Sequence, residues 1–211
     1  MTDATPTRSV VLELKDERRA MRDGYTFLDE KCLLLAGEIV RELASCEALR
    51  RRFAGAFDAA IAALQAAVAR HGLHGLQVYP PADLGTSRLA CTARSLMGVR
   101  LQDAKLALES LPASPAVDAS AKAQACRDAF AAVVEAAAPL ASAQGNLSRL
   151  SIEYRRSVRR ARALQDVLLP ELDRDVSDLE GRLEELEQED AISMRRITPD
   201  RTAADISRSS R

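Results

Sequence analysis

Aromatic residues are scarce in this 211-residue sequence, where they make up 3% of the chain and tryptophan is absent. Compact cores depend heavily on large aromatic side chains, because each of them buries much surface. Their scarcity makes a broad globular enzyme the poorer interpretation. Charge of one sign is also missing, since 30 basic and 31 acidic residues leave a formal net charge of -1. The chain as a whole therefore attracts neither nucleic acid nor anionic lipid, and we expect no nucleic-acid partner.

Long apolar runs are missing as well, and we expect no leader sequence. The apolar runs are short, such as residues 32–37, and the Ala-rich stretch from Ala129 is interrupted by Glu135 and Pro139. A membrane span needs about 18 to 20 apolar residues. The N-terminus has no basic segment followed by an apolar one. We expect a cytoplasmic chain that does not insert into a membrane.

Motifs for common enzyme chemistry are absent too. The sequence contains no GxxxxGK[ST], no GxGxxG and no HExxH. His71 and His74 have a metal-ligand spacing but no third ligand nearby, so a surface or capping role is the better interpretation. The cysteines are widely spaced without a CxxC pair, which predicts reduced thiols at Cys32, Cys46, Cys91 and Cys126. No catalytic residue, metal, cofactor or small-molecule ligand is predicted.

What the sequence does contain is two long segments of helix-forming residues around a centre rich in Gly and Pro. Residues 10–70 hold no proline, and residues 147–190 hold only Pro170 and Gly181 as helix breakers. We predict an N-terminal coiled-coil helix over 1–71, an insert over 72–140 and a C-terminal coiled-coil helix over 141–194. The Ser-, Thr- and Arg-rich residues 195–211 are predicted to form a flexible tail.

The spacing of apolar residues predicts how the two helices pair. The first helix has a heptad pattern followed by an eleven-residue one, and the last helix has the same two patterns in reverse order. This reversal predicts an all-α fold built on a long antiparallel two-helix coiled coil. The matching positions place Met21 opposite Met194 and Leu35 opposite Leu179. We call the apolar face formed by these positions the seam; it comprises Met21, Tyr25, Leu28, Cys32, Leu35, Ile39, Cys46, Leu49, Phe53, Phe57, Ala60, Leu64 and Val68 in the first helix, and Leu147, Leu150, Tyr154, Val158, Ala161, Gln165, Leu169, Leu172, Val176, Leu179, Leu183 and Leu186 in the last.

The insert is predicted to be mixed. Residues 76–79 and 88–93 have the composition of two short strands around a turn, with residues 99–101 as a candidate third strand. A small β-hairpin is therefore expected. An amphipathic helix should follow over residues 119–138 and be kinked or broken at Pro139.

Two clusters of charge stand on the C-terminal helix. An acidic group, consisting of Glu184, Glu185, Glu187, Glu189 and Asp190, is best explained as a solvated face with pairs to the other helix. A basic group, consisting of Arg155, Arg156, Arg159, Arg160 and Arg162, brings like charges close together. For this arginine cluster a solvated face and a docking surface both remain open, since an acidic partner would relieve the repulsion.

Three separated stretches carry a resemblance to a known family. Near the start, Pro6-Thr7-Arg8 leads into a helix with a Gly24-Tyr25 step, and Met97-Gly98-Val99 stands in the insert. Farther along, the segment Arg159-Arg160-Ala161-Arg162-Ala163-Leu164 is followed by Pro170. In this order the stretches resemble the D subunit of the V-type and A-type rotary ATPases.

The resemblance implies a non-catalytic central-stalk subunit that couples ATP hydrolysis or synthesis to proton or sodium transport. Its partners would be the catalytic A and B subunits of the hexamer, the small F subunit of the central stalk and the C/d-type funnel subunit, in a complex bound to the membrane. The candidate partner-contact residues are Arg155, Arg156, Arg159, Arg160, Arg162, Met97, Gly98 and Val99.

Two other classes of protein fit the same sequence. A free-standing cytosolic coiled-coil scaffold or adaptor would use the paired helices equally well, with the insert as a cap. An enzyme using His71, His74 and Cys91 would require bound metal. Co-purification with an ATPase separates the first class from a central-stalk subunit, and elemental analysis tests the second.

Overall fold

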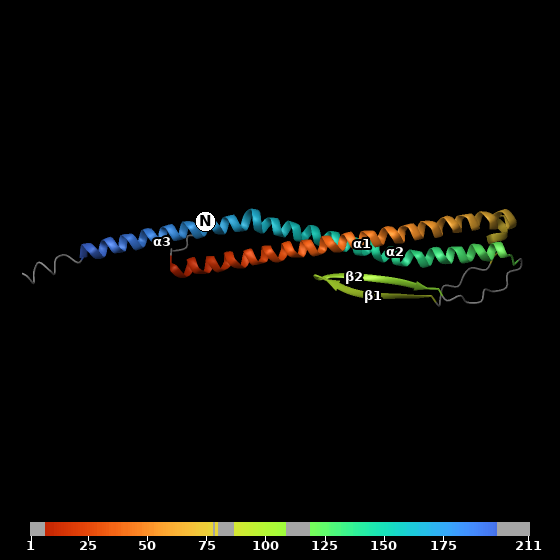
Figure 1. Cartoon of the computed structure of the whole chain (residues 1–211), viewed down its shortest axis with the longest axis horizontal. Helices are drawn as coiled ribbons and strands as arrows, with labels where there is room; N and C mark the ends of the chain where they lie inside the picture. The colour runs from red at the N-terminus through yellow and green to blue at the C-terminus, as the bar shows by residue number, and fades with distance from the viewer. Residues whose placement is uncertain (1–6, 78, 80–86, 109–118, 198–211) are drawn as a thin grey trace, which may run out of the picture. The chain divides into compact units, whose positions relative to one another are not determined.

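The computed structural model describes residues 7–77, 79, 87–108 and 119–197. Three helices, α1 (Arg8–Gln77), α2 (Ala121–Ala163) and α3 (Leu169–Ile197), account for most of them (Figure 1). The remaining elements are strands β1 (Arg88–Leu96) and β2 (Val99–Ala107) and the π-helical segment η1 (Leu164–Leu168). The predicted all-α fold with a small β-hairpin is confirmed. Of the predicted tail, residues 195–197 belong to α3, and 198–211 lie outside the described residues.

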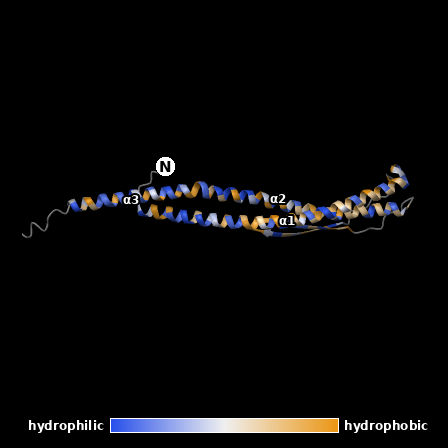
Figure 2. Cartoon of the chain, turned by 45° about the horizontal axis from the view of Figure 1, so that its top comes forward, coloured by the Kyte–Doolittle hydropathy of each residue, from blue (hydrophilic) through white to orange (hydrophobic). Residues whose placement is uncertain are grey.

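The chain divides into two compact units. The first unit consists of residues 1–30 and 158–211, and the second of residues 31–157. Each unit contains part of α1 and a later helical segment, whereas the hairpin belongs to the second unit alone. Figure 2 shows more hydrophobic colour along α1 and α2 than along α3.

The ends of α1 follow from local chemistry. At its start the Val10 backbone N–H donates to Thr7 Oγ1 at 3.4 Å, so the threonine of the Pro-Thr-Arg stretch caps the helix. Near its end Gly72 leaves helical geometry with φ 66° and ψ 167°, which glycine adopts at little cost. The helix resumes after this kink and continues to Gln77. The strand predicted over residues 76–79 is therefore wrong for Leu76 and Gln77, while Val78 lies outside the described residues.

In the first unit the beginning of α1 runs antiparallel to α3. Arg8 binds Glu187 at 2.7 Å, Lys15 pairs with Glu180, and Arg22 reaches Asp173 at 3.3 Å. Residue numbers thus fall along α3 as they rise along α1, as predicted for antiparallel partners. Val11 of α1 and Val176 of α3 are buried in this unit.

The predicted register of this pair is wrong, although the face is right. Met21 was expected opposite Met194, yet its neighbour Arg22 binds Asp173, and Met194 is 72% exposed. A seam that repeats every seven residues fits equally well after a shift by whole heptads, and the observed register differs by about three of them. Apolar periodicity therefore selects the face, and the ion pairs identify the register.

The hairpin is confirmed, and the strand predicted over residues 88–93 lies within β1, but its partner is not the predicted segment 76–79. β1 and β2 pair antiparallel with Leu96 opposite Val99, so residues 99–101 open the second strand instead of forming a third. The turn is Met97-Gly98, with φ 48° and 83°. Positive φ at both positions is the type I′ turn that matches the twist of a two-residue hairpin.

Glycine at position 98 is expected to be required by this turn. Gly98→Ala should lower the free energy of unfolding by about 1 kcal/mol, because alanine disfavours positive φ although no atom lies within 4 Å of its added Cβ. The matched control is Gly55→Ala, which adds the same methyl group to open space on α1 and should raise stability by about 0.5 to 1 kcal/mol. Urea unfolding of both variants measures the two effects. If both substitutions changed the free energy of unfolding in the same direction, this account of the turn would be contradicted.

Helix α2 continues through Pro139, so of the predicted kink or break the break is wrong. Proline removes one backbone donor from the helix ladder. Ser142 Oγ donates to the Pro139 carbonyl at 2.9 Å and adds a local bond at this point. Packing on both sides supports the continuation, because Ala136 and Leu140 are buried.

The expectation that no segment approaches the length and hydrophobicity of a membrane span is wrong for one stretch of α1. By length and composition alone, α1 contains a window apolar enough to cross a bilayer. Only 11% of this window is buried in the structure. A single such helix is weak evidence for a span, because core helices of water-soluble proteins also meet this criterion.

Candidate functional site

The hairpin is held against α1 and α2 by a small apolar core in the second unit. Leu35 of α1, Val99 and Leu101 of β2 and Leu150 of α2 are buried together. Ile39, Leu96 and Tyr154 pack around them. Burying a leucine of this kind stabilises a fold by about 1.5 to 3 kcal/mol, so the hairpin is an integral part of the unit.

Side chains of α2 also bind the backbone of β2. Asn146, which is fully buried, accepts a hydrogen bond from the Gln102 N–H at 2.8 Å and donates to the Gln102 carbonyl at 2.9 Å. Ser142 Oγ accepts from the Ala104 N–H at 3.3 Å. These side chains make the hydrogen bonds that a neighbouring strand would otherwise make. The outer edge of β2 is therefore covered by helix α2.

A charge network built on two buried glutamates connects β1 to α1. Arg94 Nη2 lies 2.6 Å from Glu38 Oε1 and 2.6 Å from Glu42 Oε1, and Arg41 also pairs with Glu38. Glu38 is 1% exposed and Glu42 is 8% exposed. The hydrogen bond to Glu38 and the nearby carboxylates raise the pKa of the Arg94 guanidinium, although desolvation opposes them. Arg94 thus provides the cation that pairs with two buried carboxylate side chains.

This network was not predicted from the sequence. The sequence signal for it is the spacing of Glu38 and Glu42, four residues apart on α1 and beside the seam residues Leu35 and Ile39. Two carboxylates in such a position need a cation from another element. Nothing in the spacing identifies Arg94 as that cation, because the pairing depends on how the hairpin docks.

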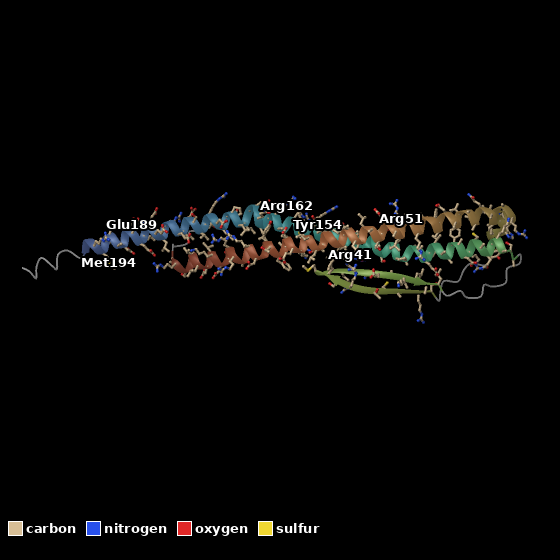
Figure 3. All side chains as sticks on the ribbon, viewed as in Figure 1. Arg41, Arg51, Tyr154, Arg162, Glu189 and Met194 are labelled. Carbon is tan, nitrogen blue, oxygen red and sulfur yellow. The ribbon has the colours of Figure 1, made fainter. Side chains whose placement is uncertain are left out.

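The predicted arginine cluster is solvent-exposed at every position. Arg155 and Arg156 belong to the second unit, and Arg159, Arg160 and Arg162 belong to the first; Arg162 is labelled in Figure 3. No hydrogen bond or ion pair joins any of them to another residue in the part of the chain that the structure describes. Their charges are thus available to a partner.

The other predicted contact residues lie at the hairpin tip. Met97 and Gly98 form the turn, Gly98 is exposed and Met97 is half-buried. Val99 is buried in the hairpin core and is therefore not available to a partner.

A π-helical segment follows the arginine cluster, in the first unit. The Leu169 N–H donates to the Leu164 carbonyl five residues earlier, which widens the helix just before Pro170. Because Pro170 has no N–H to continue the α-helical ladder, this residue is the sequence signal for the irregularity. Val167 and Leu168 are exposed within the segment.

The residues of the alternative enzyme interpretation do not form a metal site. His71 Nε2 lies 2.5 Å from Ser120 Oγ, and this oxygen also accepts from the Ala123 N–H as the N-cap of α2. His74 and Cys91 are exposed. Over residues 7–77, 79, 87–108 and 119–197, no group of three His, Cys, Asp or Glu could hold a metal.

None of the four cysteines forms a disulfide with another residue in the described part of the chain. Burial raises the pKa of the Cys126 thiol, which makes it unreactive at neutral pH. The exposed thiol is Cys91, on β1.

Comparison with known proteins gives one consistent result. The family model for the ATP synthase D subunit matches residues 10–198. A V-type ATP synthase D subunit of Thermotoga neapolitana is 23% identical, over 91% of this chain and 95% of the relative. An A-type ATP synthase D subunit of Pyrococcus furiosus is 26% identical over 91% and 92%, and a V-type D subunit of Anaeromyxobacter dehalogenans is 29% identical over 93% and 96%.

Proposed function

Because this chain belongs to the family of ATP synthase D subunits, we propose that it is a non-catalytic central-stalk subunit that transmits torque in a V/A-type rotary ATPase. The torque would pass between the ATP-hydrolysing or ATP-synthesising hexamer and the membrane ring that moves protons or sodium. The observation that carries the proposal is the family match over nearly the whole chain. Antiparallel helices held by ion pairs and apolar contacts suit a part that must resist twisting.

The proposed partners are the A and B subunits of the hexamer, the F subunit of the central stalk and the C/d-type funnel subunit. The chain would then be cytoplasmic and peripheral to the membrane. Its exposed arginine cluster supports this role, since five uncompensated positive charges favour an acidic surface on a neighbouring subunit. The alternative, a free-standing coiled-coil scaffold, has the same helices but needs no ATPase.

Purification of the tagged chain from its own cells tests the proposal. A central-stalk subunit should co-purify with a nucleotide-hydrolysing complex, and a bead attached to the chain should rotate when ATP is added. A chain that purifies without ATPase activity or other subunits would favour the scaffold alternative.

The arginine cluster should matter for assembly and not for folding. Replacing Arg159 and Arg160 with glutamine should change the free energy of unfolding by less than about 0.5 kcal/mol, because both side chains are exposed and unpaired among the described residues. Recovery of the assembled complex should fall several-fold, because charge complementarity at the contact is lost. Urea unfolding and quantitative co-purification measure the two effects.

The matched control is Arg51→Gln with Arg52→Gln, which removes two exposed arginines from α1. This control should leave both stability and assembly unchanged. If the Arg159/Arg160 variant instead unfolds in isolation and assembles normally when folded, the cluster is structural.

A further inference from the structure

The two outer edges of the hairpin differ. The edge of β2 is covered, because Asn146 binds both backbone groups of Gln102 and Ser142 binds the Ala104 N–H. Along each strand of an antiparallel pair, the backbone N–H and C=O of one residue face the partner strand, and those of the next residue face outward. The register pairs Gln102 with Ala93 and Ala104 with Cys91. These two β1 residues must therefore also turn their backbone groups outward, on the other edge.

The edge of β1 is open within the described structure. By the same alternation, its outward backbone groups belong to Leu89, Cys91, Ala93 and Ser95. No hydrogen bond joins these groups to another residue in the described parts of the chain. Eight of the nine residues of β1 are exposed. Figure 1 shows β1 on the side of the hairpin that faces away from α1 and α2.

Most of the usual protection against strand pairing is missing from this edge, where Arg88 and Arg94 are the only charged residues and Arg94 is paired with Glu38 and Glu42. Natural edge strands are usually short, bulged, interrupted by proline, or lined with charged side chains. β1 pairs with β2 at nine consecutive positions without a bulge or a proline. The four outward residues Leu89, Cys91, Ala93 and Ser95 carry no charge. Such an edge is suited to accept an extended segment as a further strand.

Charge on the hairpin indicates what kind of segment fits. Arg88, Arg100 and Lys105 are exposed and form no ion pair with another described residue. The hairpin contains a single carboxylate, Asp103. A second copy of this hairpin would bring like charges together, whereas a segment that carries Asp or Glu would be attracted.

We propose that the outer edge of β1 receives an extended acidic segment of another subunit, which adds a third strand to the hairpin. This inference rests on the proposed function, because the assembled complex supplies the partner. Backbone hydrogen bonds would provide affinity, and Arg88 on β1, with Arg100 and Lys105 on the adjacent strand, would favour acidic side chains. Asn146 and Ser142 would hold the opposite edge in place while the new strand binds.

Hydrogen exchange measured residue by residue tests the proposal on the free chain and on the complex purified from cells. In the complex, exchange of the outward amides of Leu89, Cys91, Ala93 and Ser95 should slow by about tenfold or more. The Gln102 and Ala104 amides are internal controls, because they are already bonded to α2 and should be protected in both samples.

A proline substitution provides a second test. Ala93→Pro removes an outward N–H and leaves the β1–β2 ladder intact, which edge strands tolerate. The free variant should remain folded, and its incorporation in competition with the wild-type chain should fall several-fold. Ala93→Ser is the matched control, because it keeps the backbone N–H and should be incorporated normally.

Several results would overturn the inference. Outward amides that exchange equally fast in both samples would show that nothing pairs with β1. Protection in the free chain would identify a second copy of the chain if it depended on concentration, and another part of the same chain if it did not. Equal incorporation of the Ala93 variants, with the ATPase still co-purifying, would reject the inference alone. Absence of the ATPase from the wild-type purification would reject the proposed function instead.

Discussion

Replacing Arg94 with methionine is expected to lower the free energy of unfolding by about 2 to 3 kcal/mol. The change removes the guanidinium that lies 2.6 Å from Glu38 Oε1 and 2.6 Å from Glu42 Oε1. Both carboxylates then remain buried without this cation. This value is smaller than the loss of about 3 to 5 kcal/mol typical of a broken buried ion pair. The reasons are that the Arg94 side chain is 43% exposed and that Arg41 still pairs with Glu38. Urea unfolding followed by circular dichroism measures the loss.

A matched control and a rescue identify the cause of this loss. Arg88→Met removes an exposed arginine from the other end of β1 and should change stability by less than about 0.5 kcal/mol. Adding Glu38→Gln and Glu42→Gln to Arg94→Met should recover much of the stability, since the buried charges are removed along with their partner. If the triple variant is as unstable as Arg94→Met, packing of the arginine stem and not charge is responsible.

Replacing Asn146 with alanine is expected to destabilise the second unit by about 2 to 4 kcal/mol. Asn146 is fully buried and satisfies both backbone groups of Gln102, so its removal leaves a donor and an acceptor without partners. Each unsatisfied backbone group costs about 1 to 3 kcal/mol, unless water enters. The Gln102 amide should then exchange rapidly, which hydrogen exchange detects together with the lower urea midpoint.

A graded series separates this effect from a general loss of packing. Ser142→Ala removes the single bond to Ala104 and should cost about 1 kcal/mol. Gln102→Ala should have almost no effect, because that side chain is exposed and only its backbone is bonded. The loss of stability should be largest for Asn146→Ala, smaller for Ser142→Ala and smallest for Gln102→Ala. A different ranking would show that α2 holds β2 by means other than these hydrogen bonds.

The local and periodic features of this protein could be predicted from sequence. Helix-forming composition indicated the long helices, and the seam correctly placed Leu35, Leu150 and Val176 on buried faces. Chain segments at Pro6-Thr7-Arg8, Met97-Gly98-Val99 and the arginine cluster indicated the family that the comparison then showed. These features depend on residues near one another in the chain, and the hairpin itself was expected from turn residues in the insert.

Only the tertiary structure decided the register of the helices, the pairing of the hairpin strands and the contacts that hold the hairpin. A heptad seam repeats itself, so it could not distinguish Asp173 from Met194 as the residue opposite the Met21 region. Strand propensity could not show that residues 99–107 pair with β1, because pairing requires the Met97-Gly98 turn to adopt positive φ. Asn146, Arg94 and Glu38 gained their roles only when the hairpin docked on α1 and α2. Periodicity specifies a face of a helix, whereas register and docking depend on particular bonds between residues far apart in sequence.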